Sequence, residues 1–220
     1  MLKLVVENSC YMKHPFTFFV VIASTFLSVA CRSHQPEPAI EQPTSTSSVV
    51  SNDSLVSLES KAILRLFKEK AWSKIAEHIH PSSGLRFSAY AYIDVDDDQL
   101  FSREEFKELV KSELNETRFW GWYDGSGDSI QLTFPEYTDR FIYNADFLNA
   151  EQTVLNRFLG GGNSLNNLLQ VYENQPFTES YFSGFDPQYE GMDWCCLRLV
   201  FEFDNGKPYL IAIVHDQWTI

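Results

Sequence analysis

The sequence has little positive charge, few cysteines after residue 31, and no apolar run long enough to span a bilayer. Its 17 Lys and Arg residues stand against 30 Asp and Glu residues, which gives a formal net charge of −13 at pH 7. An acidic chain repels the phosphates of nucleic acids and the headgroups of anionic lipids, so neither is an expected partner of the folded part. Cys195 and Cys196 are adjacent, which fits neither a disulfide framework nor a zinc site. We expect two buried free thiols there.

Aromatic residues, by contrast, are abundant. They make up 15% of the chain, and hydrophobic residues as a whole make up 44%, so the body can bury a substantial core. The exception is the segment 32–53, which is rich in Pro, Ser, Thr and Gln and has almost no large apolar residue. Such a composition cannot offset the entropy cost of ordering the chain. We therefore predict a disordered tether over 31–54 and a single folded domain over 55–220.

A short apolar run precedes the predicted tether. It extends from 16 to 27, about a dozen residues, which is too short for a transmembrane helix and typical of a secretory signal peptide. Lys13 and His14 supply the basic segment that such a signal needs. Met12 fits the start of this signal better than Met1, because the intervening residues include an acidic side chain.

The apolar run ends in the pentapeptide LSVAC at 27–31. This passage resembles the lipobox, the motif at which bacterial lipoproteins are diacylated on cysteine and cleaved before it. The leucine lies four residues before the cysteine, where the usual motif has three, so cleavage by an ordinary signal peptidase is the alternative. We predict a signal peptide over 1–30, lipid attachment at Cys31, and an exported chain anchored to a membrane of the bacterial cell envelope.

The body shows helical periodicity first and strand periodicity last. A Ser and a Glu three residues apart indicate a capping box, and an Asn-Gly pair between two apolar segments is a strong hairpin signal. The expected elements are helices over 55–79 with a joint at 68–70, a strand over 85–93, a helix capped by Ser102 and Glu105, a strand over 117–123, a short helix near Pro135, and strands over 194–203 and 207–215 joined at Asn205-Gly206.

This order of elements predicts an α+β domain in which N-terminal helices pack on a curved, mostly antiparallel sheet that ends in a β-hairpin. The passage 80–88, which follows the paired helices, resembles the helix-to-first-strand passage of NTF2-like domains. Residues 210–220, which close on HDQWTI, resemble a group of uncharacterised bacterial lipoproteins, as do 120–127 and 184–187. The first resemblance implies a cone-shaped fold used by enzymes and by ligand binders, and the second implies no activity.

An acidic segment after the first predicted strand has the spacing of a calcium loop. Counted from Asp94, positions 1, 3, 5 and 12 are Asp94, Asp96, Asp98 and Glu105, which is the pattern of oxygen ligands in an EF-hand. Position 6 is Gln99, where an EF-hand has Gly. Calcium is therefore the one cofactor that the sequence suggests. The alternative is an acidic lead-in to a capped helix, which is favourable at a helix N-terminus without any ion.

The aromatic residues suggest a ligand site. On a regular strand, Trp120 and Trp122 would share one face, and Phe119 and Tyr123 the other. The tryptophans could then form a stacking platform for a sugar or a peptidoglycan fragment; the alternative is that these rings fill the core. The predicted ligand-binding residues are Trp120, Trp122, Tyr90, Tyr92 and His215.

No stretch has the spacing of a known catalytic motif. The sequence favours a lipid-anchored envelope protein that binds an apolar or glycan-like ligand, or acts as a scaffold, without catalysis. The alternative is a small envelope hydrolase or isomerase-like enzyme that uses the same pocket, with His215 or an acidic residue as general base. A carboxylate or histidine with a shifted pKa inside the pocket would favour the enzyme.

Overall fold

The computed structural model describes residues 51–219, which belong to one compact unit. The predicted signal peptide, Cys31 and most of the predicted tether lie outside these residues. The predicted end of the tether at 54 is too late, because the first helix begins at Asn52. The Ser51 side chain accepts a hydrogen bond from the backbone N–H of Ser54 at 3.3 Å, and it thereby satisfies one of the free donors of the first turn.

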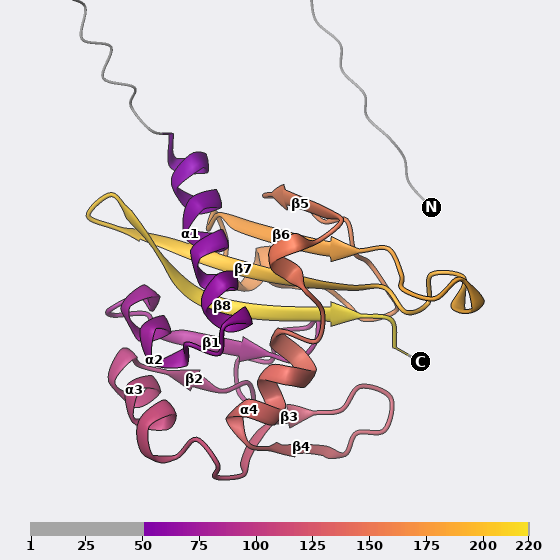
Figure 1. The fold of residues 1–220 in the computed structure, drawn as a ribbon, viewed down its shortest axis with the longest axis horizontal. Helices are drawn as coiled ribbons and strands as arrows, with labels where there is room; N and C mark the ends of the chain where they lie inside the picture. The colour runs from indigo at the N-terminus through magenta and orange to yellow at the C-terminus, as the bar shows by residue number, and fades with distance from the viewer. Residues whose placement is uncertain (1–50, 220) are drawn as a thin grey trace, which may run out of the picture. The chain divides into compact units, whose positions relative to one another are not determined.

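The predicted joint between the first two helices is confirmed. Helix α1 (Asn52–Lys68) ends at a turn in which Lys70 has a φ of 53°, and α2 (Trp72–Ile75) follows. In Figure 1, α1 crosses one face of the sheet. It buries Ile63, Leu64 and Phe67 there.

The predicted capping box is also confirmed. The Glu105 N–H donates to the Ser102 hydroxyl at 3.2 Å, and the Glu105 carboxylate accepts from the Ser102 N–H at 2.7 Å. This arrangement fixes the start of α3 (Arg103–Ser112). The other helical segments are short: η1 (Ala76–His78), α4 (Phe134–Tyr137), the π-helix η2 (Thr138–Ile142), η3 (Phe147–Asn149), α5 (Leu168–Val171) and η4 (Pro187–Tyr189).

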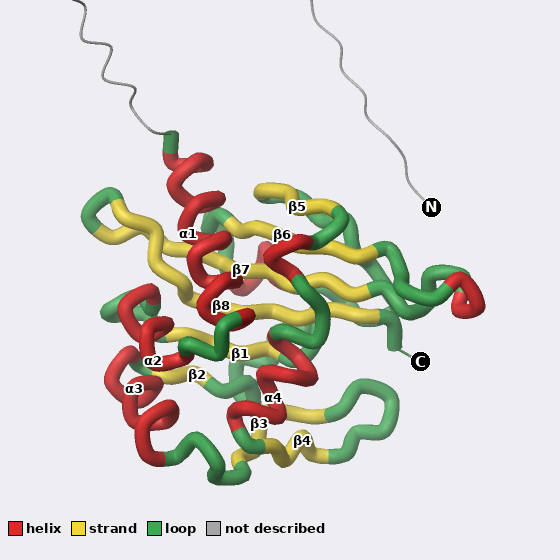
Figure 2. The backbone as a smooth tube through the Cα atoms, in the orientation of Figure 1, coloured by secondary structure: helices red, strands yellow, loops and turns green. Residues whose placement is uncertain are grey.

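Six strands form one open sheet in the order β2-β1-β8-β7-β6-β5. Strand β1 runs parallel to β8, and every other neighbouring pair is antiparallel. The predicted α+β architecture with a mostly antiparallel sheet is therefore confirmed. A separate hairpin of β3 and β4 lies beside α4 (Figure 2). The strands are β1 (Leu85–Ser88), β2 (Leu100–Phe101), β3 (Arg118–Trp122), β4 (Ser129–Leu132), β5 (Gln152–Leu155), β6 (Phe177–Phe182), β7 (Cys195–Asp204) and β8 (Lys207–Gln217).

The predicted C-terminal hairpin is confirmed. Strands β7 and β8 pair from Cys195 with Gln217 to Asp204 with Lys207. The turn places Asn205 at a φ of 49° and Gly206 at a φ of 78°, a conformation that Asn-Gly pairs adopt readily.

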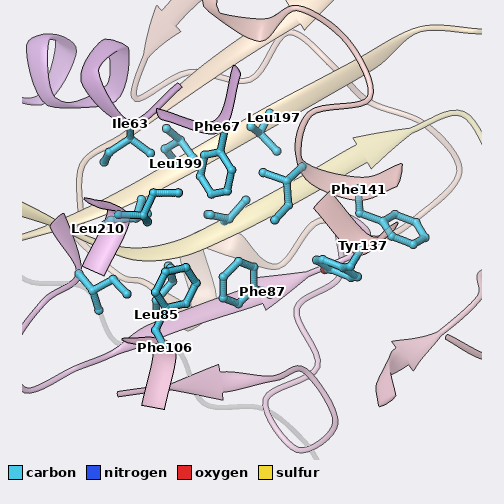
Figure 3. Packing of buried hydrophobic residues seen from close by; sticks show 14 of the residues in the cluster. Ile63, Phe67, Leu85, Phe87, Phe106, Tyr137, Phe141, Leu197, Leu199 and Leu210 are labelled. Atoms are coloured by element: carbon cyan, nitrogen blue, oxygen red, sulfur yellow. The ribbon is translucent and has the colours of Figure 1, made fainter. Parts of the chain in front are cut away.

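The main core lies between the helices and one face of the sheet. Phe87 of β1 stands at its centre, with its ring 6.2 Å or less from those of Phe106, Trp120 and Tyr137. Figure 3 shows how Phe87 converges with Phe67 of α1 and with β7 side chains in this core. Burial of this many aromatic rings is the dominant source of stability for the fold.

The opposite face of the sheet holds a smaller apolar cluster and a buried ionic network. The Arg198 guanidinium donates from Nε to Glu179 at 2.6 Å and from Nη2 to Asp216 at 2.8 Å. Glu179 also accepts from the backbone N–H groups of Leu159 and Gly160, at 2.6 and 2.8 Å. The network therefore attaches the glycine-rich segment after β5 to the sheet.

Candidate functional site

The chain bends away from the sheet at the end of β1. The strand stops at Ser88, so the predicted extension to Ile93 is wrong. The reason is local: the Ser88 hydroxyl donates to the backbone carbonyls of Tyr90 and Tyr92, at 3.0 and 3.2 Å. These bonds curl the backbone and compete with a strand ladder.

The acidic turn that follows is organised by the chain's own donors. Asp94 Oδ1 accepts from the N–H groups of Asp96 and Asp97 at 3.1 and 3.2 Å, and Asp98 Oδ2 accepts from the N–H of Asp94 at 3.0 Å. Arg86 of β1 donates from Nη1 to the Asp98 carbonyl at 3.1 Å. The turn is thus held against the sheet by a cation that bonds to backbone oxygen and leaves the carboxylates unpaired.

The two tryptophans of β3 do not share a face, contrary to the prediction. The pairing register of β3 with β4 shifts between Phe119 and Trp122, where Gly121 has a φ of 111°. Trp120 is fully buried and stacks on Tyr137 with ring centroids 4.2 Å apart. Trp122 is 50% exposed and packs against Phe119 at 5.2 Å. The irregularity breaks the strict alternation of a strand and divides the pair between core and surface.

A cavity of about 520 Å³ opens between the bend after β1, the β3–β4 hairpin and the segment before α5. Predicted ligand-binding and calcium-binding residues meet at this one place, although the sequence presented them as two separate hypotheses. Its aromatic lining is Tyr90, Tyr92, Trp120, Trp122 and Tyr123, and its acidic lining is Asp94, Asp97, Asp98 and Asp124.

The acidic side chains of the cavity are bound by neutral donors. The indole N–H of Trp122 donates to Asp97 Oδ2 at 2.7 Å. The Ser164 hydroxyl donates to Asp124 Oδ2 at 2.6 Å, and this bond, with one from Thr219, lowers the pKa of Asp124. Across residues 51–219, none of the four carboxylates lies in an ion pair.

Asp98 differs from the other carboxylates of the cavity. Burial raises its pKa to about 7, although the nearby Ser88 hydroxyl, the bond from the Asp94 N–H and the charge of Arg86 oppose the rise. Its Oδ1 faces Gly121, since a Cβ placed on that glycine would lie 3.6 Å away. A carboxyl group with a pKa near neutrality exchanges its proton at physiological pH.

His215, which the sequence placed among the ligand-binding residues, does not line this cavity. It is fully buried, with Nδ1 3.2 Å from the carbonyl oxygen of Ala89 and its ring edge-on to Phe141. Burial lowers its pKa to about 4. Ala89 itself lines the cavity, so His215 contacts the backbone of the cavity wall without facing the cavity.

The four predicted calcium ligands are not gathered around one point. Glu105 is exposed and occupied by its bonds to Ser102, and Asp96 is exposed and outside the cavity lining. Between residues 51 and 219, no three His, Cys, Asp or Glu side chains are grouped so as to hold a metal ion. Calcium binding by the acidic turn stays a prediction.

The two cysteines of the domain are buried free thiols, as predicted. They are neighbours on β7, and burial raises the pKa of each thiol. Such groups are poor nucleophiles. The cavity is therefore the only chemically distinctive site among those that the sequence indicated and residues 51–219 contain.

Four residues that line the site were not predicted from the sequence. Tyr123 was expected on the strand face opposite the tryptophans. Asp97 lies inside the acidic run, but it is position 4 when counted from Asp94, which is not a ligand position of the calcium-loop pattern. Asp124 looked like an ordinary turn residue. Ser164 comes from a segment 40 residues away from Asp124, and no local signal links the two positions.

No family model, curated protein or solved structure was found to match this chain. In the described part of the chain, no helix combines the length and the apolar character that a membrane crossing requires.

Proposed function

We propose that this chain is a lipid-anchored envelope protein that binds a small ligand in the cavity beside β1. The observation that carries the proposal is the convergence of aromatic rings and carboxylates from distant segments on one cavity of about 520 Å³. Small-molecule sites have volumes of this order and combine apolar walls with a few placed polar groups. Tyr92 and Trp122 are each 50% exposed, and large rings left open to solvent beside a cavity favour ligand binding over core packing.

We further propose that the domain is a relative of the NTF2-like class. Two helical segments at the N-terminal end, followed by a first strand that bends out of a mostly antiparallel sheet, support this proposal. Folds of this kind serve both binding and catalysis, so the proposal leaves function to the site.

An enzyme is the second candidate, and one observation favours it. Asp98 lies in the cavity with a pKa of about 7, a value suited to a general acid or base at neutral pH. The reaction class would be the hydrolase or isomerase-like chemistry expected from the sequence, with Asp98 as the acidic general base that the sequence offered as the alternative to His215.

Saturation-transfer NMR on the purified chain tests the binding proposal. The probes are N-acetylglucosamine oligomers, branched alkyl alcohols and alkylammonium ions. We expect at least one probe to receive saturation, and we expect Trp122→Ala to abolish it. Trp218→Ala is the matched control, because Trp218 is 39% exposed and lies outside the cavity. Binding that is unchanged in Trp122→Ala, or no binding by any probe, would contradict the proposal.

The same samples separate binding from catalysis. A bound probe whose spectrum is unchanged after prolonged incubation supports a binding protein. Conversion of the probe that is lost in Asp98→Asn would support the enzyme instead.

Anchoring is tested in bacterial cells that express the full chain. We expect labelled palmitate to enter the wild-type chain and not Cys31→Ser, and we expect only the wild type to sediment with membranes. Equal labelling of the two chains would exclude attachment at Cys31.

A further inference from the structure

The charge of the cavity lining indicates which class of ligand the cavity binds. Among residues 51–219, four carboxylates line it, and no Lys, Arg or His does. We infer that the ligand of this cavity is an organic cation, an ammonium group carried on a small apolar body. The inference rests on the proposed binding function and specifies the class of ligand.

The two nearby arginines bond to backbone carbonyls or stack on an aromatic ring. Arg86 donates from Nη1 to the carbonyl oxygens of Val95 and Asp98, at 3.2 and 3.1 Å. The guanidinium carbon of Arg140 lies 5.0 Å from the ring centroid of Tyr123. The acidic lining is thus held together by hydrogen bonds from a hydroxyl, an indole and backbone N–H groups. Arg86 lies close enough for its charge to act on Asp98, but none of the four carboxylates forms an ion pair within residues 51–219. Like charges gathered without an ion-pair partner raise the attraction of a site for a cation.

The walls of the cavity suit an organic cation. Tyr92 and Trp122 present exposed ring surface at the cavity, and the Trp122 ring is oriented by its bond to Asp97. A cation placed over an aromatic face is attracted by the electron density of the ring. The orientation of Trp122 by a carboxylate places both attractive elements, ring and charge, beside the same volume.

Other ligand classes use this lining less well. A calcium ion requires six to eight oxygen ligands, and much of this wall is aromatic. A neutral sugar would stack on the rings but would leave the four carboxylates without a counter-charge. An ammonium ion with alkyl substituents engages the rings and the carboxylates together.

Two probes of the same size and shape separate charge from shape. Choline carries a trimethylammonium group, and 3,3-dimethylbutan-1-ol is its uncharged carbon analogue. Isothermal titration of the purified chain should show that choline binds roughly tenfold more tightly than the alcohol, because only choline is attracted by the carboxylates and the ring faces.

Variants assign the preference to the cavity. The titrations are made at pH 8, because burial raises the pKa of Asp98 to about 7 and the group is mostly ionised there. Asp97→Asn and Asp98→Asn each keep an acceptor oxygen for the existing hydrogen bond and then remove a negative charge. Each should weaken choline binding roughly tenfold and leave the alcohol unchanged. Asp128→Asn is the matched control, because Asp128 lies in the same hairpin as Asp124 and is exposed outside the cavity lining. Circular dichroism confirms that each variant is folded.

The outcomes distinguish this inference from the binding proposal. Preference for choline that falls in the two cavity variants and persists in Asp128→Asn supports the inference. Equal binding of choline and the alcohol overturns it while the cavity remains a binding site, and so does tighter binding of an N-acetylglucosamine oligomer. Calcium binding that is lost in Asp96→Asn, without choline binding, overturns it in favour of the acidic loop. Binding of no probe overturns both proposals.

Discussion

The domain contains two groups of partly or fully buried carboxylates, and only one of them forms ion pairs. On one face of the sheet, Glu179 and Asp216 flank Arg198, and all three side chains are buried. In the cavity, neither Asp97 nor Asp98 lies in an ion pair within the described residues. Removing a charge from water is costly unless it is paired. The paired group is therefore structural, whereas the unpaired group is tolerated because the cavity admits water or a ligand.

The largest expected effect lies in the paired network. Arg198→Met leaves Glu179 and Asp216 buried without a cation, and we expect it to reduce the free energy of unfolding by about 3–5 kcal/mol. Urea denaturation measures the change. The triple variant with Glu179→Gln and Asp216→Asn removes the orphaned charges and should recover part of the loss. A loss under about 1 kcal/mol in the single variant would mean that the network does not carry the structural role that we assign.

His215 extends the comparison to a buried base that has no acidic partner. Its folded pKa of about 4 lies below the ordinary 6.5, so the unfolded chain binds this proton first as the pH falls. The free energy of unfolding therefore carries no penalty from His215 above about pH 6.5. It falls by about 3 kcal/mol as the pH drops from 6.5 to 4. We expect His215→Gln to flatten this part of the stability profile measured by urea denaturation between pH 4 and 8. An unchanged slope would exclude the buried, neutral histidine.

The glycine-rich segment that the network attaches to the sheet tolerates side chains unequally. A Cβ on Gly160 would lie 2.7 Å from the Trp194 ring and 2.9 Å from Cys196 Sγ, whereas one on Gly161 would meet nothing within 4 Å. We expect Gly160→Ala to cost about 1–3 kcal/mol, the usual effect of overpacking. Gly161→Ala is the control and should be nearly neutral in thermal melts. Similar effects of the two changes would mean that the segment is not packed as described.

The smallest expected effect has the opposite sign and belongs to the cavity. Because the pKa of Asp98 is raised from 3.8 to about 7 in the folded chain, the unfolded chain loses this proton first as the pH rises. The resulting loss of stability develops between about pH 4 and pH 7 and is complete above pH 7. We expect Asp98→Asn to stabilise the protein by about 1 kcal/mol at pH 8 and to have no effect at pH 4. The expected gain is small because the cavity is open to water, which screens the charge. Thermal melts at the two pH values measure this difference. Destabilisation at pH 8 would show that the carboxylate is compensated in a way that the contacts do not show.

Local chemistry was predictable from the sequence, and the assembly of the site was not. The capping box at Ser102 and the turn at Asn205-Gly206 depend on residues within four positions of one another, so the sequence was sufficient. The cavity depends on Gly121, whose backbone conformation reverses the expected direction of Trp122, and on a bond between Ser164 and Asp124. The pairing of Arg198 with Glu179 likewise follows from the alignment of β6 with β7. Such relations are set by tertiary packing, which outweighs strand periodicity.

The position of β8 determines when the sheet can be completed. The last long segment of the chain, Lys207–Gln217, lies between β1 and β7, so β1 can pair only with the two-residue β2 until β8 has been made. Contacts between the two ends of a chain form late and slowly, because a long loop must close first. The six-stranded sheet therefore stays incomplete until β8 has been synthesised.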